Sequence, residues 1–154
     1  MALAIIGGAP ERFGPLVSSY RQEAAHAGHD PAGLAVSINS HGYVAATSQQ
    51  AADEFFPSYA DVMTRIGLER GYGRMTRLAY DSLLARRGAI VAGSPEQVAD
   101  KILFQHEVFG HQRFLMQTSL GAMPHDLVLR SIELFGTAVA PLVNEELARR
   151  SLRG

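Results

Sequence analysis

The stretch that decides the fold reads Val91-Ala92-Gly93-Ser94-Pro95-Glu96-Gln97-Val98-Ala99-Asp100-Lys101-Ile102. A short apolar segment, residues 88–93, ends at a glycine. The next four residues combine a capping box with a proline at the first helical position, which is the clearest local signal in the chain. Apolar residues then recur at helical spacing as far as Phe109, and Gly110 predicts the helix end.

Three further apolar segments predict strands around this stretch. Residues 2–6 form a continuous apolar run that Gly7-Gly8 stops, which is typical of a strand buried in a parallel sheet. A second strand is expected over 34–45, broken or bent near 40–42, and a third over 113–119. The order is strand, helix, strand, helices, strand, helix, which predicts an α/β fold with right-handed crossovers and a three-stranded parallel sheet.

The remaining segments show helical periodicity with identifiable ends. A helix is expected over 10–27, stopped by Gly28 and Asp30-Pro31. The other expected features are a helix that begins after Thr47 or Ser48 and breaks at Pro57, a second helical stretch beyond it, a helix over 75–87, a long helix over 126–147 kinked by Pro141, and a frayed tail over 149–154.

Composition excludes several classes of function. The 154 residues are 47% hydrophobic and 19% charged, with a net charge of −1, so the sequence offers no basic surface for nucleic acid. The absence of cysteine excludes disulfides, thiolate zinc sites and cysteine nucleophiles. No apolar run approaches the ~18 residues of a membrane span. We therefore expect a cytoplasmic, soluble protein with no membrane partner.

Five segments resemble the luciferase-like flavin-dependent monooxygenases, in that family's order. Residues 91–102 resemble its glycine-serine-proline helix start, and residues 113–125 look like its last barrel strand and loop. Residues 130–143 look like the final helix, residues 3–8 like strand six, and residues 41–47 like strand seven. The closest resemblance is to the bacterial oxidoreductases of this superfamily.

The resemblance implies a partial TIM (β/α)8 barrel, roughly strands six to eight with their helices. Residues 1–154 would be a single domain, the C-terminal portion of the barrel, whereas a complete barrel has about 250 residues. The implied function is an FMN-dependent monooxygenase or oxidoreductase acting on a small molecule. In the family, loops of the fourth and fifth units hold most of the flavin phosphate, so this chain is expected to be truncated and inactive alone.

Two other hypotheses remain open at this point. The chain could be a non-catalytic oligomerising module, or a subunit that complements a separately encoded N-terminal half. In either case, unpaired sheet edges and an apolar sheet face would need cover, which predicts a homo-oligomer, most simply a two-fold dimer. The sequence does not choose between FMN and a deazaflavin coenzyme.

Six residues are candidates for binding the cofactor. Five of them end strands at the rim where barrel sites lie, and His41 lies within the second strand as a polar group that could face the pocket. The six candidates are Ile6, Gly7, Gly8, His41, Gln117 and Ser119. Each also has a structural interpretation. The glycine pair can be a tight turn, the histidine a core or bend residue, and the last two a capped strand end.

No metal site is expected. His26 and His29 are three residues apart, but Gly28 interrupts the helix and no third ligand has matching spacing. His106, His111 and His125 are scattered and are interpreted as surface or cap residues.

Overall fold

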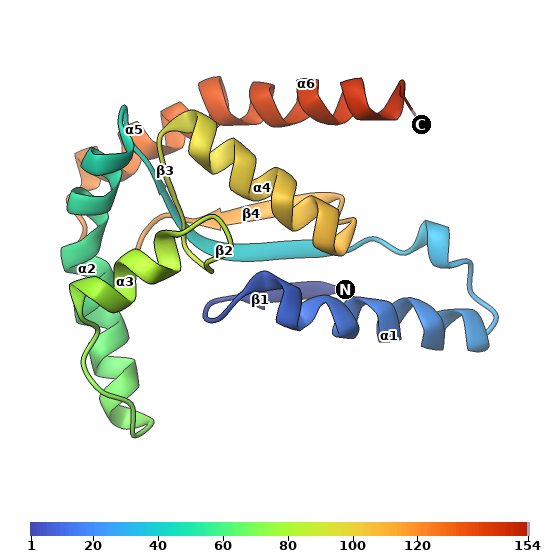
Figure 1. Cartoon of the computed structure of the whole chain (residues 1–154), viewed down its shortest axis with the longest axis horizontal. Helices are drawn as coiled ribbons and strands as arrows, with labels where there is room; N and C mark the ends of the chain where they lie inside the picture. Colours follow the sequence, from blue (N-terminus) through green and yellow to red (C-terminus); the bar gives the residue numbers. More distant parts are fainter. Residues whose placement is uncertain (154) are drawn as a thin grey trace.

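The computed structural model describes residues 1–153 and contains one parallel sheet. Its strands are β1 (Ala2–Ile5), β2 (Ser37–Val44), β3 (Val91–Gly93) and β4 (Arg113–Gln117). Residues 37–40 of β2 pair with β1 and residues 37–41 pair with β4, so these two strands lie on opposite edges of β2 (Figure 1). All pairs are parallel, which confirms the predicted α/β class.

The prediction of three strands is wrong, because β3 adds a fourth. Residues 42–44 of β2 extend beyond its partners β1 and β4 and pair with β3. The expected break in β2 is therefore a change of partner within one continuous strand. Gly42 permits it, since a Cβ there would lie 2.6 Å from both the Val91 carbonyl oxygen and Met116 Cγ.

Two helices cover one face of the sheet. A 3-10 turn, η1 (Pro10–Phe13), leads into α1 (Gly14–His26), and α4 (Pro95–Phe109) follows β3. Apolar side chains from β1, β2 and these helices form one buried cluster, whose members are Ile5, Val17, Val36, Ile38, Ala89 and Phe109. Burial of this cluster fixes the helices against the strands.

The predicted ends of α1 and α4 are confirmed. The Ser94 side chain accepts a hydrogen bond from the backbone N–H of Gln97, with the oxygen and nitrogen 3.4 Å apart, and so caps the start of α4. Gly110 ends α4 in the left-handed region with φ of 56°, and Gly28 follows α1 with φ of 84°. A second 3-10 turn, η2 (Pro31–Gly33), then leads to β2.

Two helices stand at the carboxyl ends of the strands, α2 (Ser48–Glu69) and α3 (Arg77–Leu84) (Figure 1). The predicted break at Pro57 is wrong, because α2 continues through it. A proline in a helix interior costs about 3 kcal/mol. Here Phe55 and Tyr59, on either side of it, are fully buried against the sheet and α3, and this burial offsets the lost hydrogen bond.

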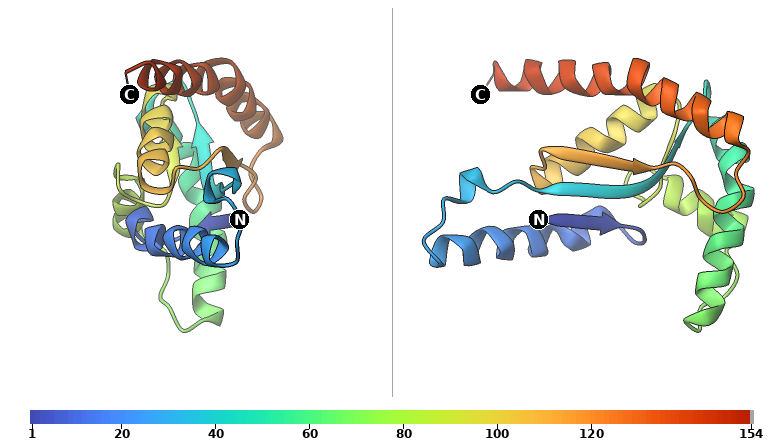
Figure 2. Two further views of the ribbon diagram at one scale, coloured as in Figure 1. Left: turned by 90° about the vertical axis from the view of Figure 1, so that its right-hand side faces the viewer. Right: turned by 180° about the vertical axis from the view of Figure 1, so that it is seen from behind.

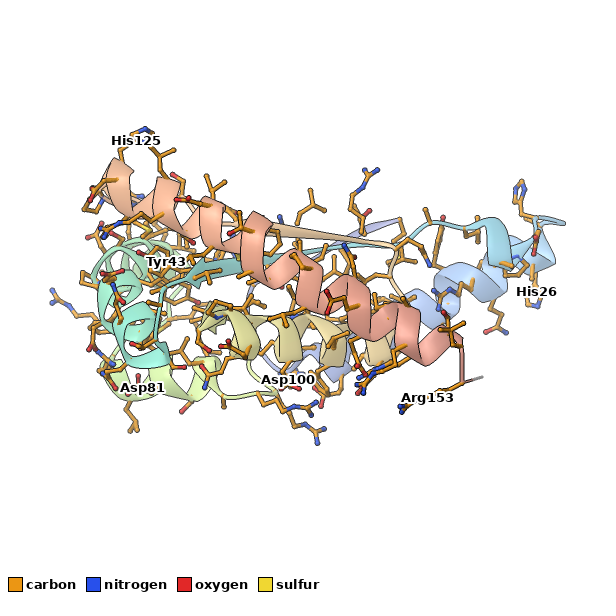
Figure 3. The ribbon with its side chains drawn as sticks, turned by 90° about the horizontal axis from the view of Figure 1, so that it is seen from above. His26, Tyr43, Asp81, Asp100, His125 and Arg153 are labelled. Carbon is orange, nitrogen blue, oxygen red and sulfur yellow. The ribbon has the colours of Figure 1, made fainter. Side chains whose placement is uncertain are left out.

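The C-terminal segment is helical in three consecutive parts, α5 (His125–Leu134), the π-helical η3 (Phe135–Val139) and α6 (Ala140–Ser151). The irregularity expected at Pro141 is thus the π-helical segment just before it. Figure 3 shows this segment crossing over α4. The frayed tail expected from residue 149 is wrong as far as Ser151, because Arg150 forms ion pairs with Glu146 and Glu107; Gly154 lies outside the described residues.

Candidate functional site

The candidate site lies on the sheet face that α1 and α4 leave open (Figure 2). Side chains alternate between the two faces of a strand, and the burial pattern follows that alternation. The open-face positions are exposed on β1 and β4 and half-buried on most of β2; they are Ala2, Ala4, Ile6, Ser37, Asn39, His41, Arg113, Leu115 and Gln117. In a complete barrel, one face of the sheet lines the interior.

Three of the six predicted site residues form a row across this face. His41 pairs with Gln117, and Ile6 follows the Ile5–Ser40 pair, so it lies beside His41. The row crosses the sheet where β1 and β4 end, while β2 continues from His41 to Val44. It is nearer the carboxyl ends of the strands, the end at which TIM-barrel sites lie. We call Ile6, His41 and Gln117 the rim row.

The other three predicted residues flank the rim row. Gly7 and Gly8 follow β1, and Gly8 has a φ of 81°, which favours glycine. A Cβ at Gly7 would meet no atom within 4 Å, so packing within this chain does not demand a glycine there. Ser119 is exposed two residues beyond β4. The structure thus brings the predicted residues to one end of one face.

His41 is the most constrained member of the rim row. Only 6% of its surface is exposed, its ring meets Tyr59 edge-on with centroids 5.8 Å apart, and its Nδ1 has no hydrogen-bond partner in the described part of the chain. Burial lowers the pKa of His41, so the ring is neutral at pH 7. A neutral imidazole with an unused nitrogen can accept or donate one hydrogen bond to a bound molecule.

Two buried tyrosines behind His41 were missed by sequence reasoning. Tyr59 of α2 contacts His41, and Tyr80 of α3 contacts Tyr59, with ring centroids 5.4 Å apart. Both are fully buried, and neither hydroxyl has a hydrogen-bond partner within residues 1–153. Burial raises the pKa of Tyr59 to about 12, so it stays protonated. Their helical spacing predicts core positions, and only the choice of tyrosine over phenylalanine signals an additional polar role.

The histidines outside the rim row differ in burial. His111 was expected at the surface, but it is 5% exposed because it lies between α4 and β4; His125 is exposed at the start of α5. His26 is exposed beside Glu23. Within residues 1–153, no three histidine, cysteine, aspartate or glutamate side chains are grouped closely enough to hold a metal ion.

No helix in residues 1–153 combines the length and apolarity needed to cross a membrane.

Several solved structures have a similar fold. One is a monooxygenase from Streptomyces bottropensis, with 21% identity and a TM-score of 0.63 over 90% of this chain and 40% of that one. Another is the oxygenating constituent of 3,6-diketocamphane monooxygenase from Pseudomonas putida in complex with FMN, with 18% identity and a TM-score of 0.63 over 88% and 41%. A third is the coenzyme F420-dependent tetrahydromethanopterin reductase from Methanopyrus kandleri, with 18% identity and a TM-score of 0.60 over 91% and 44%.

The chain therefore spans about two fifths of the length of these structures, and its fold is a part of the TIM barrel that they share. No protein of curated function matches the sequence. The sequence model described as luciferase-like monooxygenase matches residues 2–112, which is more than half of the 154 residues. The chain belongs to the luciferase-like monooxygenase family.

Proposed function

We propose that residues 1–154 form a single domain, the C-terminal portion of a flavin-dependent monooxygenase or oxidoreductase barrel. In this proposal, the rim row and its flanking residues Gly7, Gly8 and Ser119 form one wall of the flavin site. The observation that carries the proposal is the row itself. Two exposed side chains and one buried imidazole, which has no hydrogen-bond partner among the described residues, stand together on three neighbouring parallel strands where β1 and β4 end.

The residues present fit one side of a flavin ring. The space beside Gly7 is open, so a planar ring can approach the backbone there. His41 offers a neutral hydrogen-bonding nitrogen, and Gln117 offers an exposed amide. Bound FMN would supply the redox chemistry, and the side chains of this chain would bind and orient its ring. A deazaflavin coenzyme, the alternative to FMN that the sequence left open, would meet the same wall; the Methanopyrus kandleri reductase depends on coenzyme F420.

The wall is only part of a binding site. Ile6 is 40% exposed and Gln117 is also exposed, whereas ligand sites bury most of the ligand surface. The longer relatives have chain beyond the part that this protein matches. We therefore propose that the isolated chain binds flavin weakly and does not turn over a small-molecule substrate by itself.

A second candidate function is that of a non-catalytic oligomerising module or of a complementing subunit. It is favoured by the unpaired outer edges of β1 and β4 and by the exposed apolar residues Ile6 and Leu115 on the open face. A homodimer that covers this face would be compatible with either function. A cytoplasmic location accompanies both, since a chain without cysteine needs no oxidising compartment.

Amide NMR of the chain during titration with FMN tests the flavin wall. We expect the signals of Ile6, Gly8 and Gln117 to shift together, with a Kd of about 1 mM because one wall supplies few contacts. Substitution Gln117→Ala should weaken the response. The matched control Gln22→Ala removes an exposed glutamine from α1 and should leave the response unchanged.

Two results would contradict the proposal in different ways. If FMN shifts other signals and leaves those of the rim row unchanged, the row is not a flavin wall. If the isolated chain saturates with FMN at about 1 µM, the site is complete and the proposed weak binding is wrong.

A further inference from the structure

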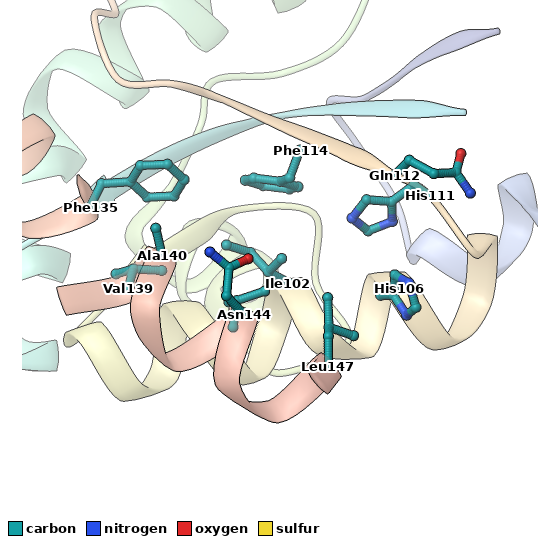
Figure 4. Close-up of a pocket in the computed structure, with 11 residues that line it drawn as sticks. Ile102, His106, His111, Gln112, Phe114, Phe135, Val139, Ala140, Asn144 and Leu147 are labelled. Carbon is teal, nitrogen blue, oxygen red and sulfur yellow. The ribbon is translucent and has the colours of Figure 1, made fainter. Parts of the chain in front are cut away.

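A cavity of about 220 Å3 lies on the opposite, helix-covered side of the sheet, near the amino end of β4 (Figure 4). Residues of α4, β4, η3 and α6 line it. Most of its wall is apolar, formed by Ile102, Phe114, Phe135, Val139, Val143 and Leu147. His106 and His111 stand close together at one end (Figure 4). The cavity therefore has an apolar body and a polar end.

The polar end contains a buried nitrogen without a partner. His111 is 5% exposed, and its Nδ1 has no hydrogen-bond partner among the described residues. Its ring meets the His106 ring edge-on, with centroids 5.4 Å apart, and contacts the Phe114 ring at a tilted angle. Buried polar atoms in proteins are nearly always paired, so this nitrogen indicates a missing hydrogen-bond partner.

The protonation state of His111 limits the kind of group that can pair with this nitrogen. Burial lowers the pKa of His111 to about 4, with a further contribution from His106, while a backbone hydrogen bond with Gln105 opposes the shift. The ring is therefore neutral at pH 7. A neutral imidazole has one donating and one accepting nitrogen, so the unpaired Nδ1 can form one hydrogen bond with a hydroxyl group, which can both donate and accept.

We propose that this cavity binds a small, mainly apolar molecule with one hydroxyl group, which forms a hydrogen bond with Nδ1 of His111. The apolar part of the molecule would pack between Phe114 and Phe135 of one wall and Val143 of α6. Size supports this class of ligand, since an apolar cavity of about 150 Å3 holds benzene. The rim row is on the other face and at the other end of the strands, so the two sites are separate.

NMR titration of the full 154-residue chain with phenol and with toluene tests the proposal. These probes have nearly the same size and differ in the hydroxyl group. At pH 7 we expect phenol to shift the methyl signals of Val139 and Val143 and to bind about tenfold more tightly than toluene, a typical effect of one hydrogen bond to a buried polar atom. His111→Phe should remove this preference for phenol.

Substitutions in α6 separate the cavity from the surface. Val143→Phe fills the cavity and should abolish binding of both probes, whereas Glu145→Phe adds the same ring at an exposed α6 position and should not. If Val143→Phe unfolds the chain, Ala140→Leu fills the same cavity with a smaller group. Equal affinity for phenol and toluene, or no response to either at about 10 mM, would overturn the proposal; in the latter case water alone pairs with His111.

Discussion

The two faces of the sheet are built from alternate residues of the same strands, yet they differ in nearly every physical property. On the helix-covered face, Ile5 and Ile38 are fully buried under α1 and α4. On the open face, Ile6 is 40% exposed and Leu115 is 42% exposed. Neighbouring residues of one strand thus experience opposite environments.

This contrast separates folding from function. The covered face supplies the apolar contacts that hold helices and strands together. The open face carries the rim row, and apart from His41, which packs against Tyr59, its residues contribute little to packing within the chain. A mutation on the covered face should therefore act on stability, and a mutation on the open face should act on binding.

The largest effect on stability is expected from a comparison of two adjacent residues, Ile5 on the covered face and Ile6 on the open face. Ile5→Ala should lower the free energy of unfolding by about 2–5 kcal/mol, because it leaves a cavity in the buried cluster. Ile6→Ala removes the same atoms from an exposed side chain and should cost less than about 1 kcal/mol. Urea denaturation measures both, and equal losses would show that the two faces do not differ in this way.

Acidification should lower the free energy of unfolding by about 3 kcal/mol through His111, on the covered side of the sheet. The pKa of His111 is about 4 in the folded chain, below its ordinary 6.5, so the unfolded chain binds more protons between these values. The contribution of His111 to stability is therefore fully present above pH 6.5 and is lost as the pH falls to 4. In urea denaturation, the wild type should therefore lose more free energy of unfolding between pH 6.5 and pH 4 than His111→Phe does.

Asn144→Ala is the control for that experiment. It removes a polar side chain from the same cavity without removing a titrating group, so the acid dependence should persist. A His111→Phe variant that keeps the full acid dependence of the wild type would contradict the assignment to His111.

A smaller effect is expected at two glycines. Gly42→Ala should cost about 1–3 kcal/mol, because its Cβ would press on the Val91 carbonyl oxygen and on Met116. Gly7→Ala has open space and should change stability by less than about 1 kcal/mol. Thermal unfolding of the two variants gives the comparison, and a loss at Gly7 as large as that at Gly42 would show that the open face is packed within the chain.

The sequence predicted those elements whose ends have a local chemical cause. Ser94 with Gln97 fixes the start of α4, and Gly28 and Gly110 fix helix ends, so these boundaries follow from adjacent residues. The parallel direction of β1, β2 and β4 followed from the alternation of strands and helices along the sequence. Pro57 was misjudged because long-range burial of Phe55 and Tyr59 offsets a local penalty.

The site was only partly predictable for the same reason. Strand ends pointed to Ile6 and Gln117, because carboxyl ends of parallel strands meet at one rim, and His41 was a candidate as a polar residue within the second strand. The ring contact between His41 and Tyr59 depends on how α2 crosses the sheet, and no local pattern specifies that. The short strand β3 was missed because its pairing requires the close approach at Gly42.

Sedimentation velocity at micromolar concentration, comparing the wild type with Leu115→Glu, tests most directly whether the open face is a surface that needs cover. We predict that the wild type sediments as a dimer and that a charge in the middle of this face shifts it towards monomer while the fold is retained. A wild-type chain that is a stable, fully folded monomer, with no difference from Leu115→Glu, would contradict this account.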